Sequence, residues 1–432
     1  MSKTIGVHER PPAVPSLLLS LQHLFAMFGS TVLVPNIFEI DPAICLLMNG
    51  IGTLLYILVT KGKIPAYLGS SFAFLGPGGA IIFSQAAGGG YAAALGGFIA
   101  AGVIFTVLAF IIQVAGTEWL NVVFPPAAMG AIVAIIGLEL VPVAAKMAGY
   151  IPGDKDDPLT WAMNPDIVII STATLAVTVL GSVLFRGFMR IIPILFGIIF
   201  GYVLAYFMKE TNFDNVADAS VFTSPTFTFP EFHWSAIIAI APVALVVIAE
   251  HIGHLIVTGN IVGKDLTKDP GLHRSMLGNG LSTILSGFVG STPNTTYGEN
   301  IGVLAITRVY STFVIGGAAV IAIILSFSGK FSALISGIPT PVMGGVSLLL
   351  FGVIAASGLR MLVESKVDYS KPTNLFLTTV VLVIGLSGVK LTIGEVSFSG
   401  MALATIVAIV LSLLFKIFEV LRMTNDDDAA AH

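Results

Sequence analysis

Charged residues are scarce in this chain of 432 residues, in which Asp, Glu, Lys and Arg together make up only 10%. A soluble domain carries about 25% charged residues, so this chain lacks the side chains that cover a water-exposed surface. The formal net charge of -4 argues against nucleic acid as a partner. The single cysteine, Cys45, excludes an internal disulfide framework. These absences together leave an integral membrane protein as the expected class.

Apolar residues take the place of the missing charges, since 56% of the chain is hydrophobic and the mean hydropathy is +0.97. Charge-free runs such as Ile167 to Phe185 and Val396 to Phe415 approach the roughly 20 helical residues that span a bilayer. The run after the polar Met1 to Pro12 has no clear cleavage site, so we expect a first membrane helix there. The sequence predicts an all-α polytopic membrane protein with about fourteen segments, near 14–34, 42–60, 66–87, 92–114, 124–145, 166–185, 191–208, 235–258, 274–290, 291–307, 308–327, 338–357, 374–392 and 399–421.

The basic residues predict how these segments are oriented. If the N-terminus is cytoplasmic and the segments alternate, 15 of the 20 Lys and Arg residues lie on the cytoplasmic side and 5 lie outside. Cytoplasmic loops of membrane proteins are enriched in Lys and Arg, so this split predicts that both termini are cytoplasmic. The five basic residues expected outside are Lys146, Lys155, Lys209, Lys330 and Lys390.

The two halves of the chain share four short matches that occur in the same order. Because seven is an odd number, two matching halves of seven spans have opposite orientations, which is the inverted repeat of many transporters. The alternative is that the matches reflect only the Gly-rich composition of membrane helices. The matching pairs are Gln22-His23 with Glu250-His251, Asn49 to Leu55 with Asn279 to Leu285, Gly69 to Ser71 with Gly290 to Thr292, and Pro125 to Gly130 with Pro339 to Gly344.

Three of the 24 acidic residues fall well inside predicted spans, namely Glu139, Glu250 and Glu299. A charge at the bilayer centre costs at least about 2.5 to 3.5 kcal/mol, so such residues usually face a cavity or a partner. Glu139 lies near the outer end of its span, and we interpret it as structural. Glu250 and Glu299 lie deeper and are the better candidates for function.

Glu250 and His254 are four residues apart and therefore share one face of a helix. A carboxylate and an imidazole in this arrangement can share or pass a proton. The alternative is a buried polar pair that only ties helices together. His251 and His254 also allow a metal site, but their order differs from H-E-x-x-H and no clear third ligand follows. We therefore expect no metal, no cofactor and no catalytic residue, and hence no enzyme.

The segments 66–87 and 291–307 differ from the others because Gly, Pro, Ser or Thr interrupts each of them. Their Thr, Tyr and Phe residues favour extended structure. Unpaired backbone groups are not tolerated in lipid, so we expect two short antiparallel strands, in segments 3 and 10, that pair with each other. Each strand is expected to lead into a half-helix whose N-terminus points at one cavity.

Such a cavity favours a particular chemistry of substrate. It offers carboxylate acceptors at Glu250 and Glu299, amide donors near Phe72 and Gly298, and an aromatic wall from Phe72 and Tyr297. An anionic substrate would be repelled by two carboxylates, and a simple cation would leave the amide donors unused. A neutral, flat heterocycle with N–H donors and carbonyl acceptors fits better.

The residues from Glu299 to Arg308 resemble the [Q/E]-N-x-G-x-x-x-x-T-[R/K/G] signature of the nucleobase–ascorbate transporter family, and Gln22-His23 resembles the QH pair of its first helix. The resemblance covers nearly the whole chain and is closest to the bacterial uracil carriers of the family. Longer similar stretches are KGKIPAYLGSSFAF, FPPAAMGAIVAIIGLEL, VVIAEHIGHL and GSTPNTTYGENIGV. The signature positions are occupied by Glu299, Asn300, Gly302, Thr307 and Arg308.

The resemblance implies proton-coupled uptake of uracil and assigns roles to individual residues. Glu250 and Glu299 would bind the substrate, and the backbone amides at Phe72 and Gly298 would meet its carbonyl oxygens. Glu299 stands where several purine carriers have Gln, which favours a pyrimidine. The remaining implied residues are Ser71 and Ala73, which flank the pocket, and Tyr297 and His254, which line it and take part with Glu250 in proton coupling.

The resemblance also implies a core domain that moves against a gate domain. The core would comprise residues 1–115 (segments 1–4) and 234–328 (segments 8–11). The gate would comprise residues 116–233 (segments 5–7) and 329–423 (segments 12–14), followed by a cytoplasmic tail at 424–432. The expected partners are uracil, protons, membrane lipid and a second copy bound through the gate domains, in the bacterial inner (cytoplasmic) membrane.

Several alternatives stay open at this stage. The substrate could be another nucleobase, such as xanthine or another purine. An anion exchanger of the same fold is a further alternative, although the two cavity carboxylates speak against it. Proteins of other classes are a membrane-embedded metalloenzyme that uses Glu250, His251 and His254, and a receptor that binds without transporting.

Overall fold

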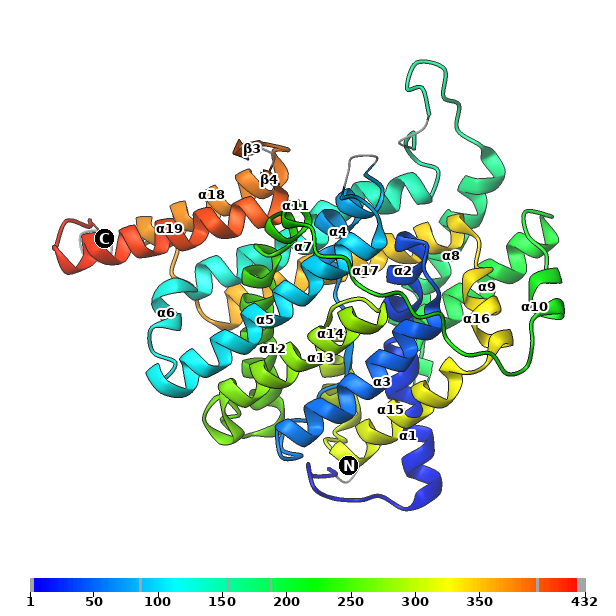
Figure 1. Cartoon of the computed structure of the whole chain (residues 1–432), viewed down its shortest axis with the longest axis horizontal. Coiled ribbons are helices and arrows are strands. Elements are labelled where there is room, and N and C mark those ends of the chain that lie inside the picture. The colour runs from blue at the N-terminus through cyan, green and yellow to red at the C-terminus, as the bar shows by residue number, and fades with distance from the viewer. Residues whose placement is uncertain are drawn as a thin grey trace.

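The computed structural model describes residues 4–84, 88–153, 156–186, 189–190, 192–393 and 396–425, and it is built almost entirely of helices (Figure 1). The predicted all-α class is thereby confirmed, apart from two pairs of short strands. The helices are α1 (Ala13–Ala26), α2 (Phe28–Phe38), α3 (Pro42–Val59), η1 (Phe72–Phe74), α4 (Leu75–Ile82), α5 (Tyr91–Ala115), α6 (Leu120–Val123), α7 (Pro126–Met147), α8 (Pro165–Leu184), α9 (Pro193–Phe207), α10 (Asp214–Asp218), α11 (Trp234–Ile240), α12 (Val243–Val262), η3 (Thr267–Gly271), α13 (Leu272–Val289), α14 (Gly298–Thr307), α15 (Thr312–Ser326), α16 (Gly329–Ser336), α17 (Thr340–Glu364), α18 (Pro372–Leu386) and α19 (Gly400–Val420). The strands are β1 (Leu68–Ser70), β2 (Asn294–Thr296), β3 (Lys390–Ile393) and β4 (Val396–Ser399).

Helices occupy every uninterrupted segment that the hydropathy pattern predicted. Within the described part of the chain, 8 helices are long and apolar enough to cross a membrane, or 9 if α15 and α16, which are bent by 90°, form one span. The shorter apolar helices include α9 and α18, and also η1 together with α4. The chain is therefore a multi-pass membrane protein.

Proline at the first turn explains where several of these helices begin. Pro42, Pro126, Pro165, Pro193 and Pro372 each stand at the start of a helix, where the missing N–H would have no acceptor inside the helix. At α3 the preceding Asp41 also accepts a hydrogen bond from the backbone N–H of Ala43, at 2.9 Å. Local sequence thus determines these helix starts independently of tertiary contacts.

The two broken segments pair with each other in the interior. Strand β1 lies antiparallel to β2, with Leu68 opposite Thr296 and Ser70 opposite Asn294. All six residues of the two strands are buried. Strand β1 leads into η1 and α4, and β2 leads into α14. The predicted pair of antiparallel strands is therefore confirmed.

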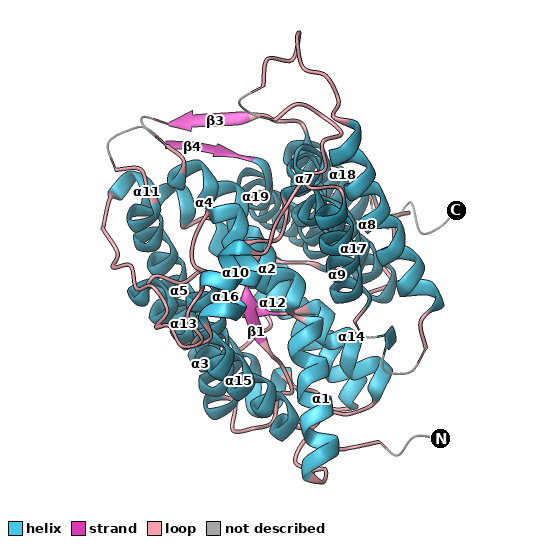
Figure 2. Ribbon diagram, turned by 90° about the vertical axis from the view of Figure 1, so that its right-hand side faces the viewer, coloured by secondary structure: helices cyan, strands magenta, loops and turns pink. Residues whose placement is uncertain are grey.

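The end of the chain corrects one prediction. The charge-free run from Val396 to Phe415 was expected to be helical from near residue 399 and to follow a span reaching 392. Instead α18 ends at Leu386, and β3 and β4 form an antiparallel hairpin before α19 begins at Gly400 (Figure 2). The β-branched and aromatic residues of this stretch favour a strand, and hydropathy does not distinguish a strand from a helix end.

The helices pack as two groups. In Figure 2, α3, α5, α13 and α15 lie on one side, and α7, α8, α9, α17 and α18 lie on the other, with α12 and β1 between them. Within the first group α13 packs on α5 and α3, and α15 packs on α3 and α1. Within the second group α17 packs on α7 and α8, and α18 packs on α7 and α19. Helix α12 contacts α5 and α13 as well as α7 and α19, so it lies at the junction of the groups.

Most of the cytoplasmic tail predicted at 424–432 lies outside the described residues, which end at 425.

Candidate substrate site

A cavity of about 230 Å³ lies where α12, at the junction of the two groups, and α14 and η1 face α7 and α17 of the second group. It brings together residues that are separated by more than 200 positions in the sequence. The lining residues are Phe72, Val133, Glu250, His254, Thr295, Thr296, Tyr297, Gly298, Glu299, Gly302, Val353, Ile354, Ser357 and Arg360.

Glu250 and His254 enter the cavity from the same face of α12, as their spacing predicted. The Oε2 atom of Glu250 is buried and has no hydrogen-bond partner among the described residues. Buried polar atoms in folded proteins are nearly always hydrogen-bonded, so an unpartnered carboxylate oxygen on a residue that lines a cavity indicates a place for a ligand donor.

His254 is held in a defined orientation by strand β2. Its Nδ1 lies 2.9 Å from the backbone carbonyl oxygen of Thr296. A carbonyl oxygen can only accept, so Nδ1 carries the proton, and Nε2 faces the start of α14. A Cβ atom built on Gly298 would lie 3.4 Å from this Nε2. Gly298 therefore leaves the imidazole room beside the helix start.

Two helix N-termini reach the cavity wall. Gly298 is the first residue of α14, and Phe72 is the first residue of η1. The first N–H groups of a helix have no acceptor inside it and carry the positive end of its dipole. Glu299 stands in the first turn of α14. Phe72, Gly298, Glu250 and Glu299, which the sequence singled out, thus line one cavity.

Two aromatic rings, those of Phe72 and Tyr297, line the site. Their centroids are 5.9 Å apart, at an interplanar angle of 64°. Phe351 of α17 is fully buried and packs against Phe72, with ring centroids 5.7 Å apart. The hydroxyl of Tyr297 donates a hydrogen bond to the backbone carbonyl of Ser70. This bond anchors the ring to β1, so the strand pair positions the aromatic wall.

Ser71 and Ala73 are not among the residues that line the cavity. Both are buried, at 1% exposure, on either side of Phe72. The backbone N–H of Ser71 donates to the carbonyl oxygen of Pro293 at 2.9 Å. This bond continues the pairing of β1 with β2 and holds Ser71 in place directly before Phe72.

The signature residues mostly shape α14. The side chain of Asn300 accepts a hydrogen bond from Nδ1 of His23, at 3.3 Å, which joins the signature to the buried Gln22-His23 pair of α1. Thr307 bonds back to Val303 at 2.8 Å, and Arg308 ends the helix with φ of 56°. Of the signature residues, Glu299 and Gly302 line the cavity, and a Cβ added to Gly302 would meet nothing within 4 Å.

Sequence reasoning missed the residues of the second group that close the cavity. These are Val133 of α7 and Val353, Ile354, Ser357 and Arg360 of α17. The repeated motif at the starts of α7 and α17 drew attention to these two helices. It did not indicate which of their later residues face the cavity. Arg360 was a detectable signal, because it is a charged residue in a long apolar helix. Its Nε lies 2.6 Å from Glu364 on the same helix.

Two further polar residues of the spans lie away from the cavity. The carboxylate of Glu139 accepts a hydrogen bond from the backbone N–H of Met401, at 2.8 Å, so it caps the start of α19 and is structural as predicted. His251 points from α12 toward α13, where its Nε2 lies 2.8 Å from Oγ of Ser275. Among the described residues there is no group of three or more His, Cys, Asp or Glu that could hold a metal ion.

Comparisons with known proteins show the family of the chain. The model of a family described as the Permease family matches residues 15–394. The chain is 60% identical to the uracil permease of Paenibacillus larvae, over 98% of this chain and 99% of the relative. It is 62% identical to the uracil permease of Escherichia coli (strain K12), over 97% of this chain and 96% of the relative. The uracil permease of Bacillus subtilis (strain 168) is 48% identical, over 95% and 94% of the two chains.

Solved structures share the fold at low sequence identity. The transmembrane domain of the cyanobacterial bicarbonate transporter BicA matches with a TM-score of 0.61 and 13% identity, over 95% of this chain and 98% of that one. The murine anion transporter Slc26a9, in the inward-facing state, matches with a TM-score of 0.67 and 13% identity, over 95% and 69% of the two chains. This likeness concerns the architecture alone.

Proposed function

The chain belongs to the nucleobase–ascorbate transporter family, and from this premise we propose that it takes up uracil together with protons across the cytoplasmic membrane. The uracil permeases of Paenibacillus larvae and Escherichia coli, which cover nearly the whole chain, support uracil as the substrate. The observation in the structure that carries the proposal is the cavity lined by the first residues of α14 and by Glu250, whose Oε2 atom is buried without a partner among the described residues.

Uracil matches the chemistry of this cavity. Its ring N–H groups would donate to the carboxylates of Glu250 and Glu299, and its carbonyl oxygens would accept from the backbone amides at Phe72 and Gly298. The flat ring would lie against Phe72 and Tyr297, which already contact each other. The volume of about 230 Å³ suits a small ring of this kind. Because uracil is neutral, no charge has to be desolvated when it enters.

Proton coupling is assigned to the same residues. A proton held near Glu250, His254 and Tyr297 would reduce the negative charge around the substrate, so proton and uracil binding would strengthen each other. Such coupling is reciprocal by thermodynamic necessity. The fixed orientation of His254 on the Thr296 carbonyl supports this role, because it directs Nε2 into the site.

Transport itself is proposed to follow alternating access of a core domain (1–115 and 234–328) against a gate domain (116–233 and 329–423), each built from segments of a fourteen-span inverted repeat. Two contacts between matched segments support the repeat. Strands β1 and β2 pair with each other, and α7 packs on α17, whose starting motif matches its own. The position of the cavity between the two helix groups supports movement of one group against the other. A homodimer through the gate domains and cytoplasmic termini complete the proposal.

An anion exchanger shares the architecture but fits the site less well. Two carboxylates line the cavity, and an anion entering it would meet both. No observation in the structure favours another nucleobase over uracil.

Proteoliposomes test the proposal directly. Purified protein is reconstituted, and uptake of radiolabelled uracil is measured with the lumen more alkaline than the bath. We expect accumulation that collapses when a protonophore is added, competition by excess uracil, and none by adenine, xanthine or sulfate. Uracil uptake that ignores the pH gradient would refute the coupling, and uptake inhibited by sulfate would refute the substrate.

A further inference from the structure

A row of hydrogen-bonded side chains extends from His254 at the substrate site to Ser275 on α13 and Tyr56 on α3. Nδ1 of His254 lies 3.4 Å from Oγ1 of Thr296, and Oγ1 of Thr296 lies 3.2 Å from Nδ1 of His251. Nε2 of His251 lies 2.8 Å from Oγ of Ser275, which lies 2.5 Å from the hydroxyl of Tyr56. Each neighbouring pair is thus within hydrogen-bonding distance, from the cavity wall to α3.

This row is buried and is assembled from four separate elements. The exposed fractions are 1% for His251, 0% for Ser275, 0% for Tyr56 and 4% for Thr296. The residues come from α12, β2, α13 and α3. Titratable neighbours of His251 are His254 on its own helix and Tyr56, whose ring lies edge-on at 6.4 Å. From β2 and α13 it meets the hydroxyls of Thr296 and Ser275.

The donors along the row are oriented by the backbone of β2. Because Nδ1 of His254 must donate to the Thr296 carbonyl, it presents a proton and not a lone pair to the Thr296 hydroxyl as well. That hydroxyl can then accept from His254 and donate to Nδ1 of His251, which leaves Nε2–H to donate to Ser275. Hydroxyls and imidazoles both donate and accept, so every position is able to pass a proton.

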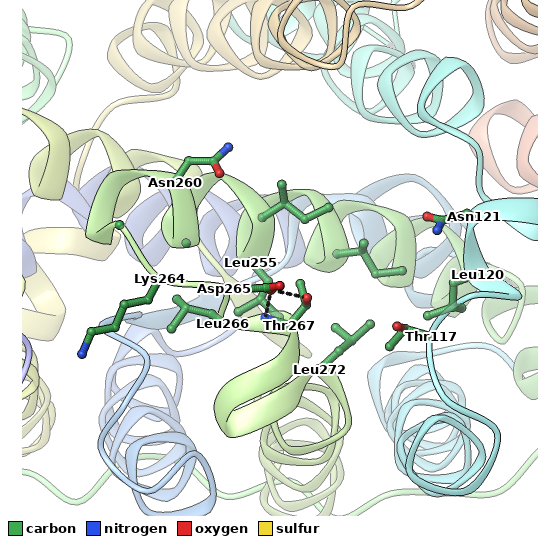
Figure 3. A pocket seen from close by; sticks show the side chains of 14 residues that line it. Thr117, Leu120, Asn121, Leu255, Asn260, Lys264, Asp265, Leu266, Thr267 and Leu272 are labelled. Atoms are coloured by element: carbon green, nitrogen blue, oxygen red, sulfur yellow. Dashed lines mark hydrogen bonds between the residues drawn. The ribbon is translucent and has the colours of Figure 1, made fainter.

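A groove at the surface is lined by residues that lie one helical turn from His251 and from Ser275. Figure 3 shows Leu255 and Leu272 in this groove, with Thr117 and Asn121 toward one end and Lys264 toward the other. The volume of the groove is about 600 Å³. Leu255 follows His251 by four residues on α12, and Leu272 precedes Ser275 by three residues on α13, so each lies one helical turn away. The groove is at the end that the basic residues predict to be cytoplasmic.

We propose that Thr296, His251, Ser275 and Tyr56 form a proton relay between His254 and this cytoplasmic groove, on a route separate from that of uracil. The proposal rests on the proposed proton coupling and names its path. A proton that binds Nε2 of His254 at the substrate site makes this imidazole cationic, and Nδ1 then gives its proton to the Thr296 hydroxyl as that hydroxyl gives its own proton to Nδ1 of His251. His251, now cationic, releases its Nε2 proton to the Ser275 hydroxyl, Ser275 gives its own proton to Tyr56, and the Tyr56 hydroxyl gives its own proton to water that enters from the groove. One proton enters and one leaves, and rotation of the groups restores the row.

Two assays separate the relay from a merely structural role. Net uptake driven by a pH gradient requires the proton to leave the protein, whereas exchange of internal for external uracil at equal pH does not. For Ser275→Ala and Tyr56→Phe we expect gradient-driven uptake to fall about 100-fold, the lower end of what a positioned proton-transfer group contributes. Uracil exchange and uracil binding should stay close to those of the unchanged protein.

Matched controls lie elsewhere in the same molecule. Ser326 is buried and bonds only back to Ile323 of its own helix, at 2.7 Å, and the buried hydroxyl of Tyr202 has no partner among the described residues. Ser326→Ala and Tyr202→Phe should leave both assays unchanged. Ser275→Thr keeps the hydroxyl and should retain gradient-driven uptake, which a packing role for Ser275 does not predict.

The possible results distinguish the relay from the coupling itself. Loss of uptake together with exchange in Tyr56→Phe, or full uptake in both Ser275→Ala and Tyr56→Phe, would overturn the relay. If Ser275→Ala does not fold, Tyr56→Phe decides alone, because it removes a single oxygen atom. Absence of gradient-driven uptake in the unchanged protein would instead refute the proposed function.

Discussion

Glu250 offers the sharpest test among single residues, because one of its oxygens is buried and unpartnered at the cavity. A hydrogen bond to a charged group contributes about 1.5 to 3 kcal/mol. Glu250→Gln should therefore weaken uracil binding by roughly 10- to 150-fold, since about 1.4 kcal/mol corresponds to a factor of ten. Thermal unfolding of the purified protein at increasing uracil concentration measures this, because a ligand stabilises the state that it binds.

The control for this prediction is Glu139→Gln. Glu139 is also a carboxylate within a span, but it caps α19 through the N–H of Met401 and lies outside the cavity. The variant should keep the affinity for uracil even if its melting temperature falls. Equal affinities of Glu250→Gln and the unchanged protein would remove Glu250 from the site.

The residue types in the motifs predicted which chemical groups the site contains better than they predicted which side chain points into the cavity. Glu250, Glu299, His254 and Tyr297 line the cavity as the motifs indicated. His251 belongs to the same motif, yet it points to Ser275 on α13. The spacing of three residues from His254 determines the angle between the two side chains around α12, but only the neighbouring helices determine which of them meets the cavity.

Among the elements, the crossing of α7 and α17 depends on glycine. A Cβ built on Gly358 would overlap the backbone of Ala134, and a Cβ on Gly137 would overlap the backbone of Phe351. Overpacking of a close interface costs about 1 to 3 kcal/mol, because backbone atoms cannot move aside locally. We therefore expect Gly358→Ala to lower the melting temperature of the protein in detergent, measured by thermal unfolding.

Gly352 provides the control on the same helix, because a Cβ built there would meet nothing within 4 Å. Gly352→Ala should keep or raise the melting temperature, since alanine is favoured over glycine in a helix by about 1 kcal/mol. If both variants melt like the unchanged protein, close packing of α7 on α17 does not limit stability.

Element boundaries were predictable where a local signal exists. Proline at the first turn and the Asp41 cap mark helix starts in the sequence itself. The hairpin of β3 and β4 had no such signal, because β-branched and aromatic residues in an apolar run are compatible with either a helix end or a strand. The pairing of β1 with β2 was predictable because lipid does not satisfy open backbone groups.

For the whole molecule, the native cysteine makes orientation testable. Cys45 is fully buried, so membrane-impermeant maleimide should label the unchanged protein weakly. Lys209 and Lys366 are both exposed and are predicted to lie on opposite sides of the membrane. In intact cells the reagent should label Lys209→Cys, and Lys366→Cys should be labelled only after lysis.

The matched control is labelling of both variants after lysis, where they should react equally because both positions are exposed. Labelling of Lys366→Cys in intact cells would place this loop outside and would contradict the proposed cytoplasmic termini.

The sequence by itself determined the membrane class, the positions of the helices and the kind of chemistry at the site. Hydropathy, helix-starting prolines and charges within apolar runs are local properties, and they depend little on the rest of the chain. The tertiary structure alone decided that α7 and α17 close the cavity, that Arg360 lines it, and that His251 joins Ser275 and Tyr56. These features depend on which face each helix turns to its neighbours. That choice follows from packing among segments distant in the chain, and no local pattern contains it.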